Sequence, residues 1–472
     1  MQQKMYLAVC VMFILIGATL GKNDLNPGIQ SKITQKGLEY GRKIAITIAQ
    51  KKIKEIHLPE ISGDFGPLYY HVTGWQITDF GLPVSDIGLI PNIGVKLSVK
   101  RAHIGIRGNW DMKYLFIRDK GTFNLNINDL SAVFAVSVSM DSSRPMIRYN
   151  RCDARLENVD LKLHGRVSWI YNLFIDKVKD KIHQIVPQKL CSKFSKMVGE
   201  LEAFIQKQAV SWQLDKYVEF DYSLVGEPEI TTDFIDFPIK GELYDVEHHT
   251  EAPFSAKLFN LANITDQMLV LGLSDYFFNT GSFAYFRAGA LQVNITDDMI
   301  SKYTPFHLST SSLGMLLPKV AKMYPNLLMK IVVHAEKPPV VKLIPGKFAS
   351  NLFFATDVYV ILPNNSLAEL FLLSITASVY GQMYISEGEL HGSVSLDSLD
   401  LVLEKSKVGT IPTKSMKEML ILELEKMLIP KINAILKKGF LIPKIDKISL
   451  INPVFKIGQG LILIGSDIQY EK

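Results

Sequence analysis

Two cysteines, Cys152 and Cys191, are the side chains whose chemistry the sequence indicates most directly. The third cysteine, Cys10, lies in an apolar N-terminal leader and would be removed with it. In an oxidising compartment the two remaining thiols have no partner but each other, so the sequence predicts a disulfide bond. This bond would join a strand to a helix across a loop of about forty residues, and chain-entropy estimates give such a crosslink roughly 3–4 kcal/mol.

Common catalytic motifs are absent from the sequence. It contains no Gly-x-Ser-x-Gly turn, no His-Glu-x-x-His helix, no phosphate-binding glycine loop and no Cys-x-x-Cys pair. His248 and His249 form a lone pair, which is more often structural than metal-binding. We therefore expect a protein that is not an enzyme and that uses no metal or cofactor. A net charge of only +5 over 472 residues, without a recognisable module, also argues against a nucleic-acid partner.

The first residues have the pattern of a secretory signal peptide. Lys4 gives a basic start, the apolar run from Leu7 to Leu20 is short for a membrane span, and cleavage is expected before Lys22. The mature chain should be secreted and extracellular, and storage in secretory granules is compatible with this route. Three sequons, which also arise by chance, mark candidate N-glycosylation sites at Asn263, Asn294 and Asn364.

The elements that would position the cysteines can be predicted from periodicity. Apolar residues three to four apart between Ile170 and Ile205 predict a long amphipathic helix, kinked or restarted at Pro187. A similar spacing from Ile29 to Ile56 predicts a second long helix with lysines at its far end. Between them, alternating runs such as Val95–Val99 and Phe123–Ile127 predict a twisted antiparallel sheet with one buried face.

The second half of the chain repeats this order. Alternating runs occur between residues 331 and 404, the stretch 268–296 is strand-like and aromatic, and an amphipathic pattern with an internal Pro430 covers Lys414–Lys438. The sequence therefore predicts an α+β fold with an internal duplication. The expected divisions are a signal peptide at 1–21, an N-terminal barrel at 22–220, a proline-containing linker that also supplies strands at 221–254, and a C-terminal barrel at 255–472.

A twisted sheet beside one long amphipathic helix closes into a tube. If side chains fill the tube, it is an ordinary core, which is the more frequent case. If the helix stands off from the sheet, the tube leaves an apolar slot for acyl chains, and each buried methylene contributes about 0.8 kcal/mol. Periodicity does not distinguish the two.

Scattered motifs resemble, in order along the chain, the family of bactericidal/permeability-increasing and lipopolysaccharide-binding proteins. They include the spacing of Cys152 and Cys191, Asn26-Pro-Gly28, Gln35-Lys-Gly-Leu38, Pro91-Asn92, Gly241-Glu242, Gly272-Leu-Ser-Asp-Tyr-Phe-Phe-Asn279 and Lys438-Gly-Phe440. The resemblance implies an elongated boomerang of two pseudo-symmetric barrels joined by a central sheet. It also implies an apolar pocket for a phospholipid in each barrel, which favours the hollow tube.

The resemblance further implies a role in innate immunity, with lipopolysaccharide on the bacterial outer membrane as a partner beside phospholipid. In the family a basic N-terminal tip, made by the end of the first helix and a strand–strand turn, binds lipid A. The matching and neighbouring cations here are Lys51, Lys52, Lys54, Arg107, Lys113, Arg118 and Lys120. Trp110, in the turn expected at 110–120, would be a membrane-interface aromatic. A solvated rim for the cations, and packing of Trp110 on its own hairpin, are the alternatives.

The turn also departs from the family pattern. Asn109, Asp111, Tyr114 and Leu115 stand where the bactericidal member has basic residues. Lipid binding tolerates this loss better than lipopolysaccharide binding does. The alternative function is therefore a lipid-transfer or carrier protein of the same family without bactericidal activity. In either case we expect a monomer.

Overall fold

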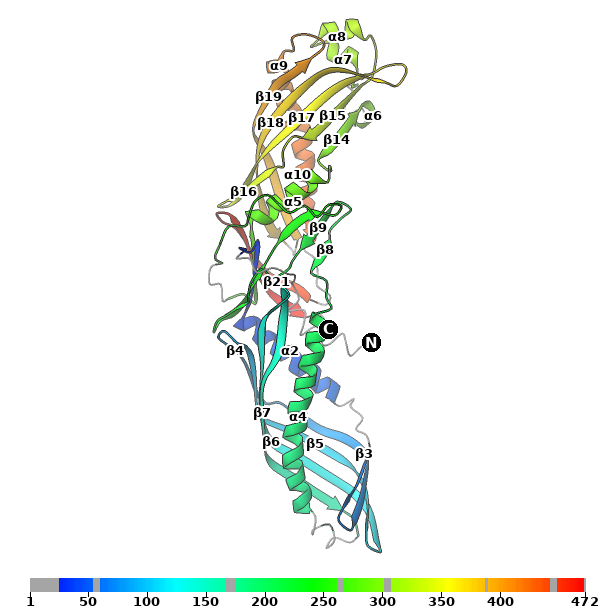
Figure 1. Cartoon of the computed structure of the whole chain (residues 1–472), viewed down its shortest axis with the longest axis vertical. Coiled ribbons are helices and arrows are strands. Elements are labelled where there is room, and N and C mark those ends of the chain that lie inside the picture. Colours follow the sequence, from blue (N-terminus) through cyan, green and yellow to red (C-terminus); the bar gives the residue numbers. More distant parts are fainter. Residues whose placement is uncertain are drawn as a thin grey trace.

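A computed structural model describes residues 25–53, 60–166, 171, 175–261, 266–300, 307–386, 389–441 and 448–470. The predicted signal peptide, Lys54 and the sequon at Asn263 lie outside these ranges. The described chain is long and gently bowed, with a curled sheet at each end and a further sheet between them (Figure 1). This is the predicted α+β boomerang.

Long antiparallel strands form the sheet of the N-terminal half. Its order is β2 (Ile61–Phe65), β3 (Leu68–Gly81), β5 (Gly94–Tyr114), β6 (Ile117–Asp141) and β7 (Arg144–His164), and β4 (Val84–Ile90) also pairs with β5. Within β6, Phe123, Leu125 and Ile127 are buried whereas the asparagines between them are exposed. The predicted alternation therefore gives this sheet one apolar face and one polar face.

Two helices, α2 (Gln35–Ile53) and α4 (Ile175–Ile205), lie on the apolar side of this sheet (Figure 1). In the N-terminal half of α4, Ile182 and Val186 pack on the buried cluster around Phe123. In the C-terminal half of α4, Val198 packs beside Ile147 of β7. Pro187 lies inside one continuous helix, so the predicted restart does not occur there.

The first predicted helix begins later than its spacing suggested. Residues Ile29–Thr34 form strand β1, which pairs with β11 on one side and with β13 on the other. Ile29 and Ile33 fit both a helical spacing and a strand alternation. Pairing on both sides satisfies the backbone groups of β1, and this tertiary context selects the strand.

The central sheet combines strands from both ends of the chain. Its order is β10 (Glu229–Ile230), β11 (Phe234–Ile239), β1, β13 (Leu269–Ser274), β22 (Leu461–Tyr470) and β21 (Ile448–Ile457). A smaller sheet of β12 (Glu242–Asp245), β9 (Val218–Asp221) and β8 (Ser211–Gln213) packs against helix α5 (Asp275–Arg287). The stretch expected to be strand-like between 268 and 296 thus contains a helix. Its aromatic residues Phe277 and Tyr285 pack on that smaller sheet.

The C-terminal half repeats the plan of long strands followed by a long helix. Its sheet has the order β14 (Gln292–Thr296), β15 (Met329–Ala335), β17 (Lys347–Ile361), β18 (Leu367–Ser386), β19 (Glu389–Ser406) and β20 (Phe440–Leu441), with β16 (Val340–Ile344) paired to β17. Its helices are α6 (Asp297–Ile300), α7 (Thr310–Gly314), α8 (Pro318–Met323), α9 (Thr413–Glu423), the π-helical turn η1 (Leu424–Leu428) and α10 (Ile429–Lys438). Pro430 likewise lies within continuous helical backbone, in the first turn of α10 directly after the π-helical turn.

Candidate functional site

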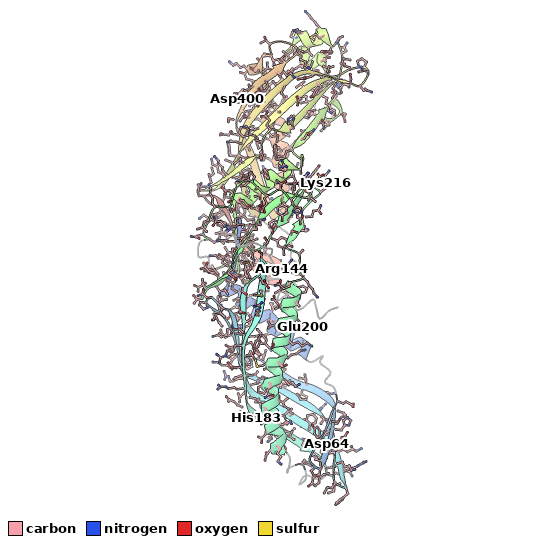
Figure 2. All side chains as sticks on the ribbon, viewed as in Figure 1. Asp64, Arg144, His183, Glu200, Lys216 and Asp400 are labelled. Carbon is pink, nitrogen blue, oxygen red and sulfur yellow. A yellow bond between two sulfur atoms is a disulfide. The ribbon has the colours of Figure 1, made fainter. Side chains whose placement is uncertain are left out.

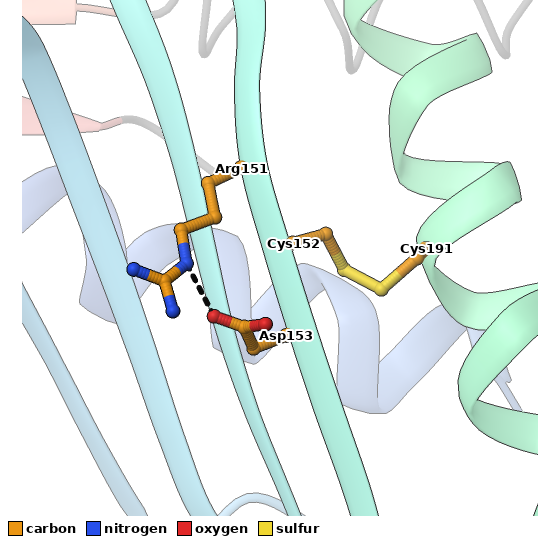
Figure 3. Close-up of a disulfide and its surroundings, with 4 residues drawn as sticks. All are labelled: Arg151, Cys152, Asp153 and Cys191. Carbon is orange, nitrogen blue, oxygen red and sulfur yellow. Dashed lines mark hydrogen bonds and ion pairs between the residues drawn. A yellow bond between two sulfur atoms is a disulfide. The ribbon is translucent and has the colours of Figure 1, made fainter.

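The predicted disulfide joins Cys152 on β7 to Cys191 on α4 (Figure 3). The two Cα atoms are 5.6 Å apart although 39 residues separate them in the sequence. Beside Cys152, the Arg151 guanidinium donates a hydrogen bond to the Asp153 carboxylate. The bond attaches the middle of α4 to the edge strand of the sheet and so limits how far the helix can move from it or towards it.

An apolar cavity of about 470 Å³ lies between α2, α4, the N-terminal sheet and the central sheet. Its apolar lining includes Leu38, Ile44 and Ala45 from α2, Phe194, Val198 and Leu201 from α4, Val95, Leu97, Val99, Val136 and Val138 from the sheet, and Ile33, Ile235, Phe237 and Ile468 from the central sheet. This volume falls within the range of about 300–1,000 Å³ that ligand pockets occupy. The helices stand off from the sheet here, so this part of the N-terminal half is hollow.

Two glycines on α2 have opposite surroundings. A Cβ on Gly37 would lie 2.6 Å from the carbonyl oxygen of Met268, so only glycine allows α2 to approach the central sheet this closely. A Cβ on Gly41, one turn later, would meet nothing within 4 Å, and Gly41 lines the cavity. The first glycine therefore positions the helix, and the second leaves space beside it.

One part of the cavity wall is polar. Arg42 is the charged residue among those that line the cavity, and its side chain is 17% exposed. Its Nη1 donates to Ser85 Oγ at 2.7 Å, while Nε and Nη2 donate to the same Oε2 of Glu39 at 2.9 and 2.8 Å. Nearby in the lining, the backbone N–H of Tyr470 donates to the Tyr40 hydroxyl at 2.9 Å. Strand β22 of the central sheet thus contributes part of the wall of the cavity in the N-terminal half.

Three of the predicted cations meet at the far end of the N-terminal sheet. Lys113 on β5 lies directly opposite Arg118 on β6. Two residues further from the turn, Lys120 on β6 lies opposite Asp111 on β5. All four side chains are exposed. Among the described residues no ion pair involves Lys113 or Arg118.

The other predicted cations lie elsewhere. Arg107 is six residues before Lys113 on β5, and its Nη2 donates to Gln76 Oε1 at 3.0 Å. Lys51 and Lys52 belong to the last turn of α2. In Figure 1 the last turn of α2 lies closer to the middle of the molecule than to the far end of the N-terminal sheet. Asp64, labelled in Figure 2, marks that far end. The structure therefore brings together Lys113, Arg118 and Lys120 but does not place Arg107 or the end of α2 beside them.

Trp110 is not at the surface, so its assignment as a membrane-interface aromatic is wrong. Its side chain is 6% exposed, its Nε1–H donates to the carbonyl oxygen of Thr122 at 3.0 Å, and its ring meets Tyr171 edge-on with centroids 5.4 Å apart. The expected turn at 110–120 is in fact two residues long, because β5 continues to Tyr114 and β6 begins at Ile117. Trp110 therefore hydrogen-bonds within its own hairpin, as the alternative expected, but its ring packs in a core cluster that includes Tyr171 from outside the hairpin.

The residues that form the real turn were not among the predicted contacts. Phe116 is 88% exposed and Leu115 is 57% exposed, at the point where β5 meets β6. The signal in the sequence was a Leu-Phe pair between two charged strands, where a turn usually carries polar residues. Of the described sequons, Asn294 is exposed on edge strand β14 and Asn364 is exposed in the turn between β17 and β18.

Comparison with known proteins settles the family. The model of the N-terminal domain of the LBP / BPI / CETP family matches residues 37–202, and the model of its C-terminal domain matches residues 212–470. The chain belongs to the LBP / BPI / CETP family. This family member is 35% identical to a bactericidal permeability-increasing protein of Sebastes schlegelii over 98% of this chain and 100% of that protein.

Further relatives extend the similarity. The LBP / BPI / CETP family member is 26% identical to a lipopolysaccharide-binding protein of Homo sapiens, over 98% of this chain and 97% of that protein. A crystal structure of lipopolysaccharide binding protein matches with a TM-score of 0.59 and 27% identity, covering 95% of this chain and 100% of that one. None of the helices described in this family member has the length and apolar character needed to cross a bilayer.

Proposed function

We propose that this protein is a secreted lipid-binding protein of innate immunity. It holds phospholipid acyl chains in the apolar cavity of its N-terminal half, and it binds the lipid A part of lipopolysaccharide on Gram-negative bacteria through Lys113, Arg118 and Lys120. Membership of the LBP / BPI / CETP family supports the proposal, as do relatives named for lipopolysaccharide binding. The single observation that carries it is the cavity, because a packed interior would have no room for a ligand.

The cavity suits a hydrocarbon chain for energetic reasons. Its lining is almost wholly apolar, so water gains little there, whereas each buried methylene of a ligand contributes about 0.8 kcal/mol. Ten methylenes would contribute on the order of 8 kcal/mol before the cost of ordering the chain. The Cys152–Cys191 bond helps to keep the space open, since it sets the distance between α4 and the sheet.

The cations at the end of the sheet suit a phosphate-bearing ligand. Like charges directly opposite on antiparallel strands destabilise a sheet, and Lys113 lies opposite Arg118. A lipid A phosphate between them would remove this repulsion and add on the order of 1 kcal/mol per contact. Asp111, opposite Lys120, lowers the local positive charge and so favours weaker binding than a purely basic turn would give.

Mass spectrometry of an organic extract of the purified protein tests the cavity. We expect phospholipid in about equimolar amounts, and a lipid-free extract from a protein that also takes up no added lipid would reject the proposal. Titration with lipopolysaccharide tests the cations in a Lys113→Ala/Arg118→Ala double variant. Loss of lipopolysaccharide binding with retained cavity lipid is expected. If the double variant binds lipopolysaccharide as wild type does, the assignment of these cations is rejected. If wild type binds no lipopolysaccharide and vesicle-to-vesicle lipid transfer is active and unchanged in the double variant, the carrier alternative is correct.

A further inference from the structure

The turn between β5 and β6 carries two apolar side chains that are largely exposed. Phe116, at 88%, is the most exposed large apolar side chain of the described residues, and Leu115 beside it is 57% exposed. Single exposed apolar residues are common on protein surfaces, but these two adjacent ones occupy the outermost point of a long hairpin. Their position at the tip of the hairpin, in addition to their exposure, indicates a contact with a partner.

The backbone adds a second observation. Leu115 has a φ of 53°, in the left-handed region that glycine and asparagine adopt more readily than leucine. A polar residue at this position would therefore suit both the turn and its contact with water. Leucine in this conformation is a cost to the folded state, and strained positions of this kind cluster at functional sites.

Along the strands that lead away from the turn, the exposed side chains change from apolar to charged. The first exposed row contains Lys113 and Arg118, with Tyr69 opposite Lys113 on the neighbouring strand β3. Strands rise about 3.3 Å per residue, and each cation is two residues from the turn, so this row lies roughly 7 Å behind Leu115 and Phe116. Apolar groups in front, followed by tyrosine and cations, form the order of groups that lipid interfaces favour.

We propose that Leu115 and Phe116 enter the acyl region of a lipid A layer while Lys113 and Arg118 contact its phosphates. This inference rests on the proposed function and extends it, because it assigns an inserting turn where lipopolysaccharide recognition alone needs only cations. The depth fits, since apolar faces of interfacial proteins reach about 5–10 Å into the headgroup and acyl boundary. The Tyr69 phenol would lie at headgroup level, with its ring towards the acyl chains.

Binding to vesicles that contain lipopolysaccharide tests the insertion. A Phe116→Ser variant should partition on the order of 10-fold or more less strongly than wild type, because a buried phenylalanine side chain is lost. Leu258→Ser is the matched control, since Leu258 is 70% exposed but lies in the loop before β13, away from this end. Equal partitioning of wild type and Phe116→Ser would overturn the inference.

A second measurement separates insertion from a general loss of fold. Leu115→Asn should leave the protein equally or more stable to urea, because asparagine suits the left-handed turn, yet it should weaken vesicle binding. In a Phe116→Trp variant the added fluorescence should shift to the blue on vesicles with lipopolysaccharide and be quenched by brominated acyl chains, whereas Leu258→Trp should show neither effect. A shift only on anionic phospholipid vesicles without lipopolysaccharide would overturn the choice of lipid A.

The two proposals can fail separately. If wild type binds no lipopolysaccharide at all, the proposed function fails and the inference fails with it. If wild type binds but Phe116→Trp shows no blue shift or quenching, the cations alone account for recognition and only the insertion is rejected.

Discussion

Filling the cavity from Gly41 should exclude lipid and stabilise the empty protein. Gly41 lines the cavity and a Cβ there would meet nothing within 4 Å, so Gly41→Leu projects into open space. Replacing glycine in a helix interior gains about 1 kcal/mol, and burying the leucine side chain adds roughly 1.5–3 kcal/mol. We therefore expect delipidated Gly41→Leu to be about 2.5–4 kcal/mol more stable to urea than delipidated wild type.

The same substitution should reduce lipid retention. The leucine side chain takes the space of about four methylenes of the ligand, worth roughly 3 kcal/mol at 0.8 kcal/mol each. Retention should therefore fall on the order of 100-fold, since every 1.4 kcal/mol is a factor of ten. The assay is lipid per protein, by extraction and mass spectrometry, after exchange against empty vesicles.

Two other glycines supply controls. Gly199→Leu on α4 has equally open surroundings but is exposed, so it should keep its lipid. Gly37→Ala should destabilise the protein, because its Cβ would lie 2.6 Å from the Met268 carbonyl oxygen. The reasoning is refuted if Gly41→Leu retains as much lipid as Gly199→Leu.

Three further predictions concern the disulfide, the buried indole and a buried carboxylate. Replacing Cys152 and Cys191 together by alanine should lower the free energy of unfolding by about 4 kcal/mol, measured by urea denaturation against the oxidised protein. Trp110→Ala should cost about 3–5 kcal/mol of stability, and vesicle binding normalised to folded protein should not change, because the indole is buried. Burial raises the pKa of Asp236 to about 6, although Lys32 opposes the shift. Between the unfolded value and 6 the folded state binds more protons, so stability rises as pH falls through that window. Lowering the pH from 7 to 5 should therefore stabilise wild type relative to Asp236→Asn in urea titrations, and a parallel pH dependence of the two would contradict the assignment.

Several features of this protein follow from its sequence alone. Two thiols without other partners define the Cys152–Cys191 bond, whatever the fold between them. Alternation from Phe123 to Ile127 gives a strand with one buried face, because successive side chains point to opposite sides. The long periodic stretch that ends at Ile205 gives α4, since a stripe of that length leaves no competing element.

Tertiary structure decided the features for which local patterns were ambiguous. Ile29 and Ile33 fit a helix or a strand, and two neighbouring strands selected the strand. The aromatic stretch at Asp275–Arg287 became a helix through packing on the smaller sheet. Trp110 is buried because Tyr171, from the segment before α4, packs edge-on against its ring, and no local pattern predicts that contact.

The cavity is the clearest case of a property that only the fold determines. Its wall combines Ile33, Phe194 and Ile468, which lie far apart in the sequence. A pattern of apolar residues predicts which side chains are buried. It does not predict whether the apolar faces of two elements pack in contact or leave a cavity between them. That depends on the distance at which Gly37 and the Cys152–Cys191 bond hold the two helices, and this distance exists only in the assembled molecule.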